Sequence, residues 1–197
     1  MGKKLLALLL CGALLVTVLA ACGAPEEKDV SVEQDSQFVE TEKEPDTGDA
    51  SLDNPRNQDG IGEKELLVVS FGTSYNDSRR LTIGAIETAM EKAFPDYAVR
   101  RGFTSQIIID HVKSRDNVSI DNVKQALDRA VENGVKTLVI QPTHLMDGLE
   151  YNDLVDEVAQ YSDAFEYLAI GKPLLTSEAD FQAVEQAITE ATAEYDD

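Results

Sequence analysis

Two side chains that could act together on a metal or a proton follow one apolar run of the chain. Residues 135–140 form a continuous apolar stretch that indicates a buried strand, and residues 151–158 repeat apolar positions at helical spacing. His144 and Glu150 lie between them, in the loop at the carboxyl end of the predicted strand. Ligands of open α/β sheets bind at that rim. An imidazole and a carboxylate placed there suit a metal site or a proton-transfer site.

A second candidate loop follows an earlier apolar run, at residues 65–71. It contains small residues and hydroxyls beside the start of a predicted helix, where free backbone amides can bind a carboxylate or a phosphate. It has neither the Gly-Lys-Ser/Thr ending of a P-loop nor the Gly-x-Gly-x-x-Gly spacing of a dinucleotide site. A tight turn between strand and helix explains the same pattern equally well. The residues of this loop are Ser70, Phe71, Gly72, Thr73 and Ser74.

Positive charge on the same rim is predicted from a third loop. Arg100 and Arg101 lie near the end of a more polar predicted strand, and Thr104 and Ser105 follow it. In so acidic a chain, a basic pair beside hydroxyls could attract an anionic ligand, and a surface salt bridge is the alternative. His111 falls inside the next predicted helix and is interpreted as a surface or structural histidine.

Strands and helices alternate along residues 64–197. Strands are predicted at residues 65–71, 97–103, 135–141 and 165–170, and helices at residues 78–93, 105–114, 120–132, 151–161 and 178–193. Such alternation favours an α/β domain, with a parallel sheet flanked by helices and right-handed crossovers. The side chains expected to face the core from the first, third and last helices are Ile83, Ile86, Ala89, Met90, Ala93, Val123, Ala126, Leu127, Ala130, Val131, Phe181, Val184, Ile188 and Ala191.

The N-terminus is interpreted as a lipoprotein signal peptide covering residues 1–21. Lys3 and Lys4 precede an apolar run at residues 5–20, and a lipobox, Leu-Ala-Ala-Cys, ends at Cys22. Acylation of Cys22 would anchor the mature chain by lipid at the periplasmic or extracellular face of a membrane. An uncleaved membrane anchor is the alternative, but the apolar run is short for a spanning helix. Whether the cell has one membrane or two is left open.

Residues 22–63 are rich in Glu, Asp, Ser, Thr, Pro and Asn, have few apolar residues and show no periodicity. Such a segment cannot bury enough apolar surface to offset its chain entropy, so it is predicted to be a disordered, extended tether. It carries much of the acidic excess behind the net charge of -20, which argues against nucleic acid as a partner. Cys11 leaves with the signal peptide and Cys22 carries lipid, so a metal in the mature domain would be held by nitrogen and oxygen ligands.

Three segments of the chain, residues 67–75, 101–105 and 144–151, resemble one enzyme family. In order and spacing they are similar to the anaerobic-type sirohydrochlorin cobaltochelatase, a class II chelatase, over essentially all of residues 65–197. The resemblance implies a chelatase-like, flavodoxin-like half domain. It also implies insertion of Co2+, without ATP, into sirohydrochlorin, a tetrapyrrole that carries many carboxylates, during cobalamin biosynthesis. Related members insert Ni2+ or Fe2+, and some bind haem.

The resemblance also assigns roles to single residues. It implies that Glu150 binds the metal and that Glu150 and His144 are the catalytic groups. Those roles fit the chemistry, since a chelatase must hold Co2+ loosely and must remove the protons of two pyrrole N–H groups. The residues that the resemblance places near the tetrapyrrole are Ser70, Phe71, Gly72, Thr73, Ser74, Arg101, Thr104 and Ser105.

The chain departs from the family at the second half. The family pattern has two similar halves, and its main histidines lie in the second, beginning with a Gly-His-Gly motif that this sequence lacks. The equivalent loop of the first half carries Phe71. Three interpretations follow: a fragment of a longer protein, which is the one we expect, a homo-oligomer whose domains pair, or a lipid-anchored protein that binds haem, another metallo-tetrapyrrole or metal without catalysis. In each case the catalytic set within this chain is predicted to be incomplete.

Overall fold

The computed structural model describes residues 46–195. The predicted signal peptide, the lipidation of Cys22 and most of the predicted tether lie outside the described residues. Within that range, no helix combines the length and the apolar character needed to cross a bilayer.

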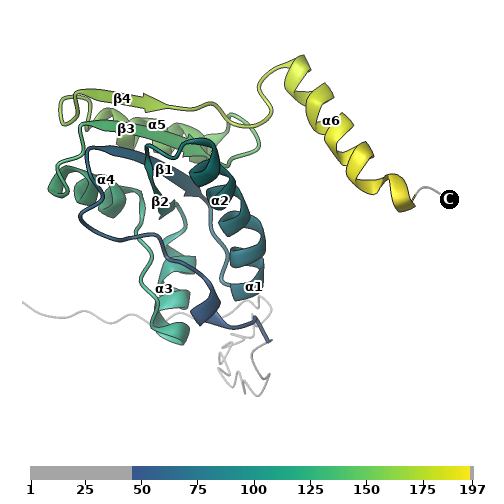
Figure 1. The fold of residues 1–197 in the computed structure, drawn as a ribbon, viewed down its shortest axis with the longest axis horizontal. Helices are drawn as coiled ribbons and strands as arrows, with labels where there is room; N and C mark the ends of the chain where they lie inside the picture. The colour runs from purple at the N-terminus through teal and green to yellow at the C-terminus, as the bar shows by residue number, and fades with distance from the viewer. Residues whose placement is uncertain (1–45, 196–197) are drawn as a thin grey trace, which may run out of the picture. The chain divides into compact units, whose positions relative to one another are not determined.

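Four parallel strands form one sheet in the order β2-β1-β3-β4 (Figure 1). The strands are β1 Lys64–Ser70, β2 Ala98–Phe103, β3 Thr137–Pro142 and β4 Tyr167–Ile170. All four were predicted from the sequence, with ends shifted by one or two residues. The parallel sheet confirms the predicted α/β class.

Helices connect the strands and cover both faces of the sheet (Figure 1). They are α1 Asn76–Ser78, the π-helical turn η2 Arg79–Ile83, α2 Gly84–Ala93, α3 Gln106–Asp116, α4 Val123–Glu132, α5 Leu149–Ala159 and α6 Glu178–Thr192, with short 3-10 turns at Ala50–Leu52 and Ala193–Tyr195. The chain moves from β1 to β2 in one direction and from β2 to β3 in the other. Right-handed crossovers then place α2 on one face and α4 and α5 on the opposite face.

The larger part of the core lies between the sheet and the pair α4 and α5. Apolar side chains of β1 and β3 that point to this face pack on apolar side chains of the two helices. The main members of this cluster are Leu67, Val69, Ala126, Leu127, Ala130, Leu138, Ile140, Leu154 and Val158. Because these strands and helices bury a continuous apolar layer, they hold the carboxyl ends of β1 and β3 in fixed positions.

Some core positions predicted from periodicity are wrong. The ones that are exposed instead are Ile86, Ala89, Ala93 and Val131. On α2 the fully buried side chain is Glu87, which accepts two hydrogen bonds from Arg101 at 2.7 and 2.8 Å. The buried pair of Glu87 and Arg101 thus helps to fix which side of α2 faces the sheet. The spacing of apolar residues gives no sign of such a pair.

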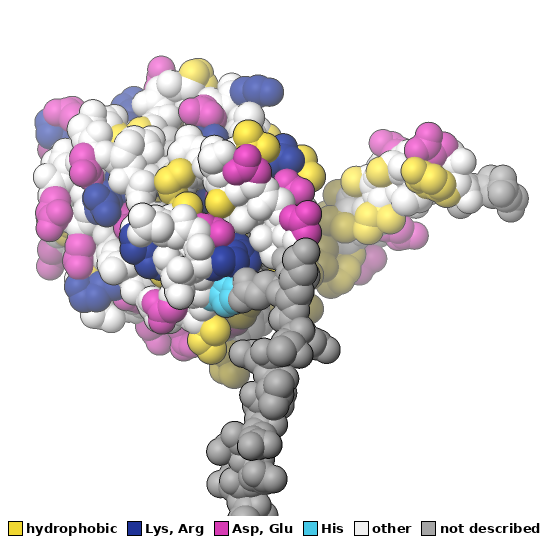
Figure 2. All heavy atoms as spheres, turned by 90° about the horizontal axis from the view of Figure 1, so that it is seen from below, with side chains coloured by type: hydrophobic (Ala, Val, Ile, Leu, Met, Phe, Trp, Pro, Cys, Tyr) yellow, Lys and Arg dark blue, Asp and Glu magenta, His cyan; other side chains and the backbone are white. Residues whose placement is uncertain are grey.

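The helix α6 also differs from its prediction. Within the described chain none of its residues is buried, and Phe181 and Ile188 are 53% and 58% exposed. The prediction that Phe181, Val184, Ile188 and Ala191 pack on the core is therefore wrong. Figure 2 shows hydrophobic and acidic side chains along this helix, whose sequence contains no Lys or Arg.

The last part of the predicted tether belongs to the folded domain. The carboxylate of Asp53 is 2% exposed and accepts hydrogen bonds from Arg79 at 2.6 Å and from Arg101 at 2.7 Å. Arg56 is 7% exposed, and its carbonyl oxygen accepts a hydrogen bond from the backbone N–H of Arg101 at 3.2 Å. The prediction of a disordered tether that reaches residue 63 is therefore wrong for residues 46–63. The composition of the segment did not predict that it is folded, because its order depends on a few charged residues that pair with buried residues far away in the sequence.

The two arginines predicted to charge the rim are buried beneath it. Arg101 is 1% exposed, and its guanidinium is shared between Asp53 and Glu87. Arg100 is fully buried and donates to backbone carbonyl groups of the segment before β1 and to Asp121 at 3.2 Å. Neither guanidinium can meet a ligand from solvent. The predictions of a cationic rim and of Arg101 as a substrate-binding residue are therefore wrong.

Candidate functional site

The carboxyl ends of β1 and β3 lie side by side at the centre of the sheet. The winding direction of the chain changes between these two strands, and in open α/β sheets such a switch point carries the ligand site. Ser70 ends β1, Thr143 follows β3, and the hydroxyl of Thr143 donates to that of Ser70 at 2.9 Å. This bond joins the two loops that contain Phe71 and His144.

His144 and Glu150 meet in this region, as predicted from the sequence. Nε2 of His144 lies 3.7 Å from Oε2 of Glu150, and the two side chains are 8% and 51% exposed. Among residues 46–195, neither ring nitrogen of His144 has a hydrogen-bond partner. Burial lowers the pKa of His144 from its ordinary value of 6.5, and the charge of Glu150 opposes that shift. The imidazole is therefore neutral at neutral pH and offers a lone pair beside a carboxylate.

A cavity of about 530 Å3 opens on one side of this pair. Its wall is mainly apolar and includes Phe71, Leu145, Met146 and Leu149. These four side chains are between 49% and 85% exposed, which is unusual for large apolar groups gathered in one place. Such a surface suits the face of a flat, largely apolar ligand.

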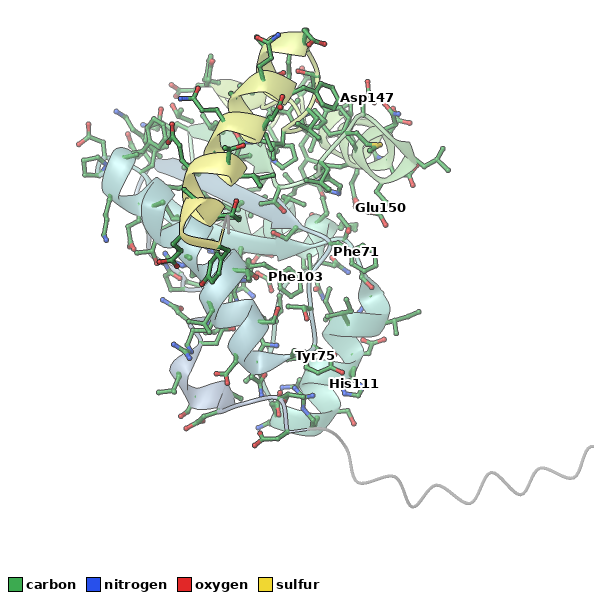
Figure 3. The ribbon with its side chains drawn as sticks, turned by 90° about the vertical axis from the view of Figure 1, so that its right-hand side faces the viewer. Phe71, Tyr75, Phe103, His111, Asp147 and Glu150 are labelled. Carbon is green, nitrogen blue, oxygen red and sulfur yellow. The ribbon has the colours of Figure 1, made fainter. Side chains whose placement is uncertain are left out.

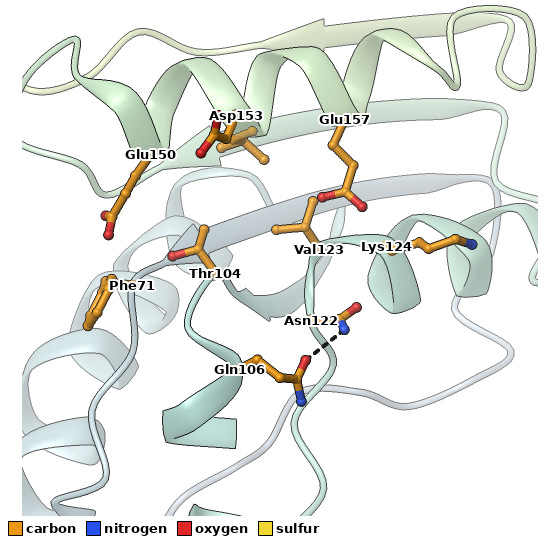
Figure 4. Close-up of a pocket in the computed structure, with 10 residues that line it drawn as sticks. Phe71, Thr104, Gln106, Asn122, Val123, Lys124, Glu150, Asp153 and Glu157 are labelled. Carbon is orange, nitrogen blue, oxygen red and sulfur yellow. Dashed lines mark hydrogen bonds between the residues drawn. The ribbon is translucent and has the colours of Figure 1, made fainter. Parts of the chain in front are cut away.

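A second cavity, of about 550 Å3, opens on the other side of Glu150 (Figure 4). Three carboxylates of α5 line it, those of Glu150, Asp153 and Glu157. Burial raises the pKa of Glu157, the charge of Lys124 opposes this, and that of Asp128 adds to it. The facing wall includes Thr104, Gln106, Asn122 and Lys124, with the amide of Asn122 donating to that of Gln106 at 3.0 Å. Three carboxylates in one cavity attract cations.

The loop after β1 presents backbone N–H groups at the same rim. Gly72 has a φ of 103°, and a Cβ built on it would lie 2.5 Å from the ring of Phe103, so only glycine fits. The carbonyl groups of Thr73 and Ser74 accept hydrogen bonds from Arg79 and Arg115. Within the part of the chain that the structure describes, the backbone N–H groups of Gly72, Thr73 and Ser74 donate to no acceptor. They are available to an anion.

The structure brings together most of the residues predicted from the sequence. Phe71, Thr104, His144 and Glu150 line the two cavities. The side chain of Ser70 is buried at 2% exposure, and the backbone N–H of Ser105 donates to the carbonyl of Phe71 at 3.2 Å, so both support the loop. In Figure 3, Phe71 lies beside Glu150, whereas Tyr75 and His111 lie towards α1 and α3. His111 is exposed on α3, outside both cavities.

Sequence reasoning missed part of the site. It did not single out Asp153, Glu157, Lys124 or Thr143. The spacing of Glu150, Asp153 and Glu157, three and then four residues apart, places them on one face of α5 and could have revealed the acidic cavity. Among residues 46–195, no three His, Cys, Asp or Glu side chains converge as a metal site.

Comparison with known proteins gives the family of the chain. The family model for cobalt chelatase (CbiK) matches residues 64–196. The sirohydrochlorin cobaltochelatase of Salmonella typhimurium (strain LT2) is 40% identical over 126 residues, which are 64% of this chain and 48% of that protein. The sirohydrochlorin cobaltochelatase CbiKC of Nitratidesulfovibrio vulgaris (strain Hildenborough) is 29% identical over 136 residues, which are 67% of this chain and 48% of that protein. This chain therefore spans about half the length of these curated relatives. By the match over residues 64–196, the chain belongs to the cobalt chelatase (CbiK) family.

Proposed function

We propose that this chain supplies one half of a site that inserts Co2+ into sirohydrochlorin. The observation that carries the proposal is the position of Glu150, which lines both the acidic and the apolar cavity and lies 3.7 Å from the imidazole of His144. A cation collected on one side can thus meet a macrocycle bound on the other. Both curated relatives are named for this reaction, and both are about twice as long as the matched region.

The metal would reach the site through the acidic cavity. The carboxylates of Asp153 and Glu157 lie about one and two turns along α5 from Glu150 and attract divalent cations. A carboxylate oxygen and a neutral imidazole nitrogen both suit first-row divalent metals. Two donors hold such an ion weakly, and weak binding favours its transfer. The name of the family and those of both relatives support Co2+, and neither supports the Ni2+ or Fe2+ that the sequence left open.

The proton balance gives His144 its role. When Co2+ enters the ring, two pyrrole N–H groups lose their protons, so two proton acceptors are needed. Once Co2+ has passed from the imidazole of His144 to the ring, the single lone pair of that neutral imidazole is free to accept one proton, and the nearby Glu150 stabilises the resulting cation. The second acceptor is then expected from the half that the relatives have beyond the matched region.

The loop after β1 would hold the carboxylates of the substrate. The free backbone N–H groups of Gly72, Thr73 and Ser74 take the role that the sequence assigned to Arg101. Phe71 and the exposed apolar side chains around Met146 would contact the ring face. The domain would work at the outer face of a membrane, held there by a lipid on Cys22.

A chimera tests the proposal directly. Residues 46–196 of this chain would replace the matched half of the Salmonella relative, and the absorbance change of sirohydrochlorin would report insertion of Co2+. We expect turnover, and we expect Glu150→Gln to slow it by about 100-fold or more. The matched control is Asp156→Asn, on the same helix but outside both cavities. A folded chimera that binds sirohydrochlorin without inserting Co2+ would overturn the proposal, and equal rates for the two variants would remove Glu150 from the site.

A further inference from the structure

Two arginine side chains bind the backbone of the loop after β1. Nη1 of Arg79 donates to the carbonyl of Thr73 at 3.1 Å, and Nη2 of Arg115 donates to that of Ser74 at 2.6 Å. Across a trans peptide bond, the C=O of one residue and the N–H of the next point in opposite directions. The bond from Arg79 therefore turns the N–H of Ser74 away from the arginine and leaves it available to an anion. The two arginines thus stabilise the conformation in which the loop presents its N–H groups.

Both arginines share an acceptor, the side chain of Asn76, which is 2% exposed. Its Oδ1 accepts hydrogen bonds from Nη2 of Arg79 at 2.5 Å and from Nη2 of Arg115 at 3.2 Å. Arg79 is fully buried, and its Nε also donates to Oδ2 of Asp53 at 2.6 Å. Because the donors of a guanidinium are fixed in one plane, Asn76 and Asp53 together decide where the remaining N–H groups of Arg79 point.

The other end of the Asn76 amide binds residues 46–53, which we call the N-terminal strap. Nδ2 of Asn76 donates to the carbonyl of Gly48 at 3.1 Å and to the hydroxyl of Thr47 at 3.3 Å. The backbone N–H of Asp77 donates to the carbonyl of Thr47 at 2.8 Å, so the strap lies beside α1 (Figure 1). The strap lies outside residues 64–196, which the family model matches.

The strap therefore fixes the orientation of the Asn76 amide. Its acceptors hold Nδ2 on the side of the strap, which leaves Oδ1 facing the guanidinium groups of Arg79 and Arg115. Without the strap, Nδ2 would lose two of its acceptors inside the protein, and a buried donor without an acceptor is costly. An amide rotated by half a turn would present its N–H groups to the two guanidinium groups and lose both of their hydrogen bonds.

We propose that the N-terminal strap positions the loop after β1 for the carboxylates of the substrate. Thr47 and Gly48 act through Asn76, and Asp53 acts through Arg79, so these strap residues are positioning residues that do not touch the ligand. A loop whose N–H groups are already in place binds an anion without the entropic cost of ordering the loop. The proposal rests on the proposed function for the identity of the ligand. The order of the loop itself can be measured without any ligand.

Gly48→Ala in the full chain tests the strap. Gly48 has a φ of 89°, and a Cβ built on it would lie 2.3 Å from Cγ of Asp77, so the strap must shift away from α1. The matched control is Gly60→Ala, which has a similarly strained φ of 68° but meets nothing within 4 Å. Binding of sirohydrochlorin, followed by its absorbance, should weaken by about 10-fold in Gly48→Ala and by less than about 2-fold in the control. Circular dichroism should show that both variants are folded, because neither substitution touches the contacts of Asp53.

NMR order parameters of the loop amides give a second measurement, which needs no ligand. For Gly72, Thr73 and Ser74 they should be near 0.85 in the wild type and should fall below about 0.6 in Gly48→Ala. Adding Asp77→Ala removes the side-chain atoms that the new methyl group would meet. The double variant should therefore recover the loop order and the affinity of Asp77→Ala alone.

The two measurements separate this proposal from the proposed function. Equal affinity of Gly48→Ala and Gly60→Ala for sirohydrochlorin would overturn the positioning role. Weaker binding by a Gly48→Ala chain whose loop stays rigid would overturn it as well, because the strap would then act without ordering the loop. A wild-type chain that does not bind sirohydrochlorin would contradict the proposed function, and the order parameters alone would then decide whether the strap positions the loop.

Discussion

Asp53 and Arg101, 48 residues apart, form a buried ion pair with two hydrogen bonds, Nη1 to Oδ2 at 2.7 Å and Nη2 to Oδ1 at 3.1 Å. Their side chains are 2% and 1% exposed. Burial alone would raise the pKa of Asp53, but hydrogen bonds and charge from Arg101 and Arg79 outweigh it and leave that pKa lowered. The pair fastens the segment before β1 to the middle of β2.

Replacing Asp53 is therefore expected to destabilise the domain strongly. Asp53→Ala leaves the guanidinium groups of Arg79 and Arg101, both essentially inaccessible to water, short of one partner. Breaking a buried pair by removing one side costs about 3–5 kcal/mol of unfolding free energy. Urea unfolding followed by circular dichroism measures this. The control is Asp59→Ala, whose carboxylate is 69% exposed and pairs with Arg129, and which should cost far less because solvent screens that pair. Similar losses for the two variants would contradict the importance of the buried pair.

Glu65 is expected to make stability depend on pH. It is fully buried near the start of β1, and among the described residues neither of its carboxylate oxygens has a hydrogen-bond partner. Burial raises the pKa of Glu65 from 4.5 to about 7, with Arg100 opposing the shift and Asp121 adding to it. The folded state thus keeps a proton that the unfolded chain has already lost. The stabilisation is complete below pH 4.5 and disappears as the pH rises through about 7.

The comparison that measures this effect is between the wild-type chain and Glu65→Gln. Relative to the variant, the wild type should lose up to about 3 kcal/mol of unfolding free energy as the pH rises across this range. Glu63→Gln, at a carboxylate that is 65% exposed, serves as the control and should show no such trend. A constant gap between wild type and Glu65→Gln would mean that Glu65 is ionised in the folded state throughout.

The ionisation of His144 can be observed directly, because the chain has only two histidines. Burial lowers the pKa of His144 and the charge of Glu150 raises it, with burial the larger effect. An NMR titration should therefore give a value below 6.5, and Glu150→Gln should lower it further. His111→Gln assigns the signals. A value above 6.5 would show that the ring is solvated or better paired than the structure indicates, and would remove its role as the neutral proton acceptor.

The glycine of the loop after β1 should tolerate no side chain. Gly72→Ala needs a φ of 103° and sets a methyl group 2.5 Å from the ring of Phe103. Gly134→Ala shares the strained backbone, at a φ of 72°, but meets nothing within 4 Å. The first variant should therefore lose about 1–3 kcal/mol more stability than the second, as measured by thermal unfolding. Equal losses would show that Phe103 moves aside at no cost.

Anchoring by lipid remains a prediction from the sequence. Cys22→Ser removes the thiol of the lipobox, so the precursor should stay unprocessed and should not incorporate a fatty-acid probe in cells. Cys11→Ser, within the apolar run, should be processed and labelled normally. Normal cleavage and labelling of Cys22→Ser would exclude this anchor.

Sequence patterns predicted the features that depend on neighbouring residues, and they failed for the features that depend on contacts between residues far apart in the sequence. The strands and the loop with His144 and Glu150 could be placed, because apolar runs and helical spacing are read over a few neighbouring residues. The burial of Arg101 could not, because it depends on Asp53, far away in the sequence. Periodicity located the apolar face of α6 correctly, but it cannot say which surface covers that face. The average composition of residues 22–63 did not reveal that a few side chains of this segment contact the folded domain.

The segment before β1 also closes the outer edge of the sheet. β2 is an edge strand, and on the side away from β1 the backbone N–H of Arg101 donates to the carbonyl of Arg56, and that of Phe103 to the carbonyl of Asp121. An open edge strand is a template for pairing with other molecules. A truncated chain that starts at residue 64, where the family match begins, would leave the N–H of Arg101 without this hydrogen bond. We expect such a shortened chain to aggregate through strand pairing between molecules. The segment before β1, whose composition is the least typical of folded structure, therefore protects the domain from aggregation.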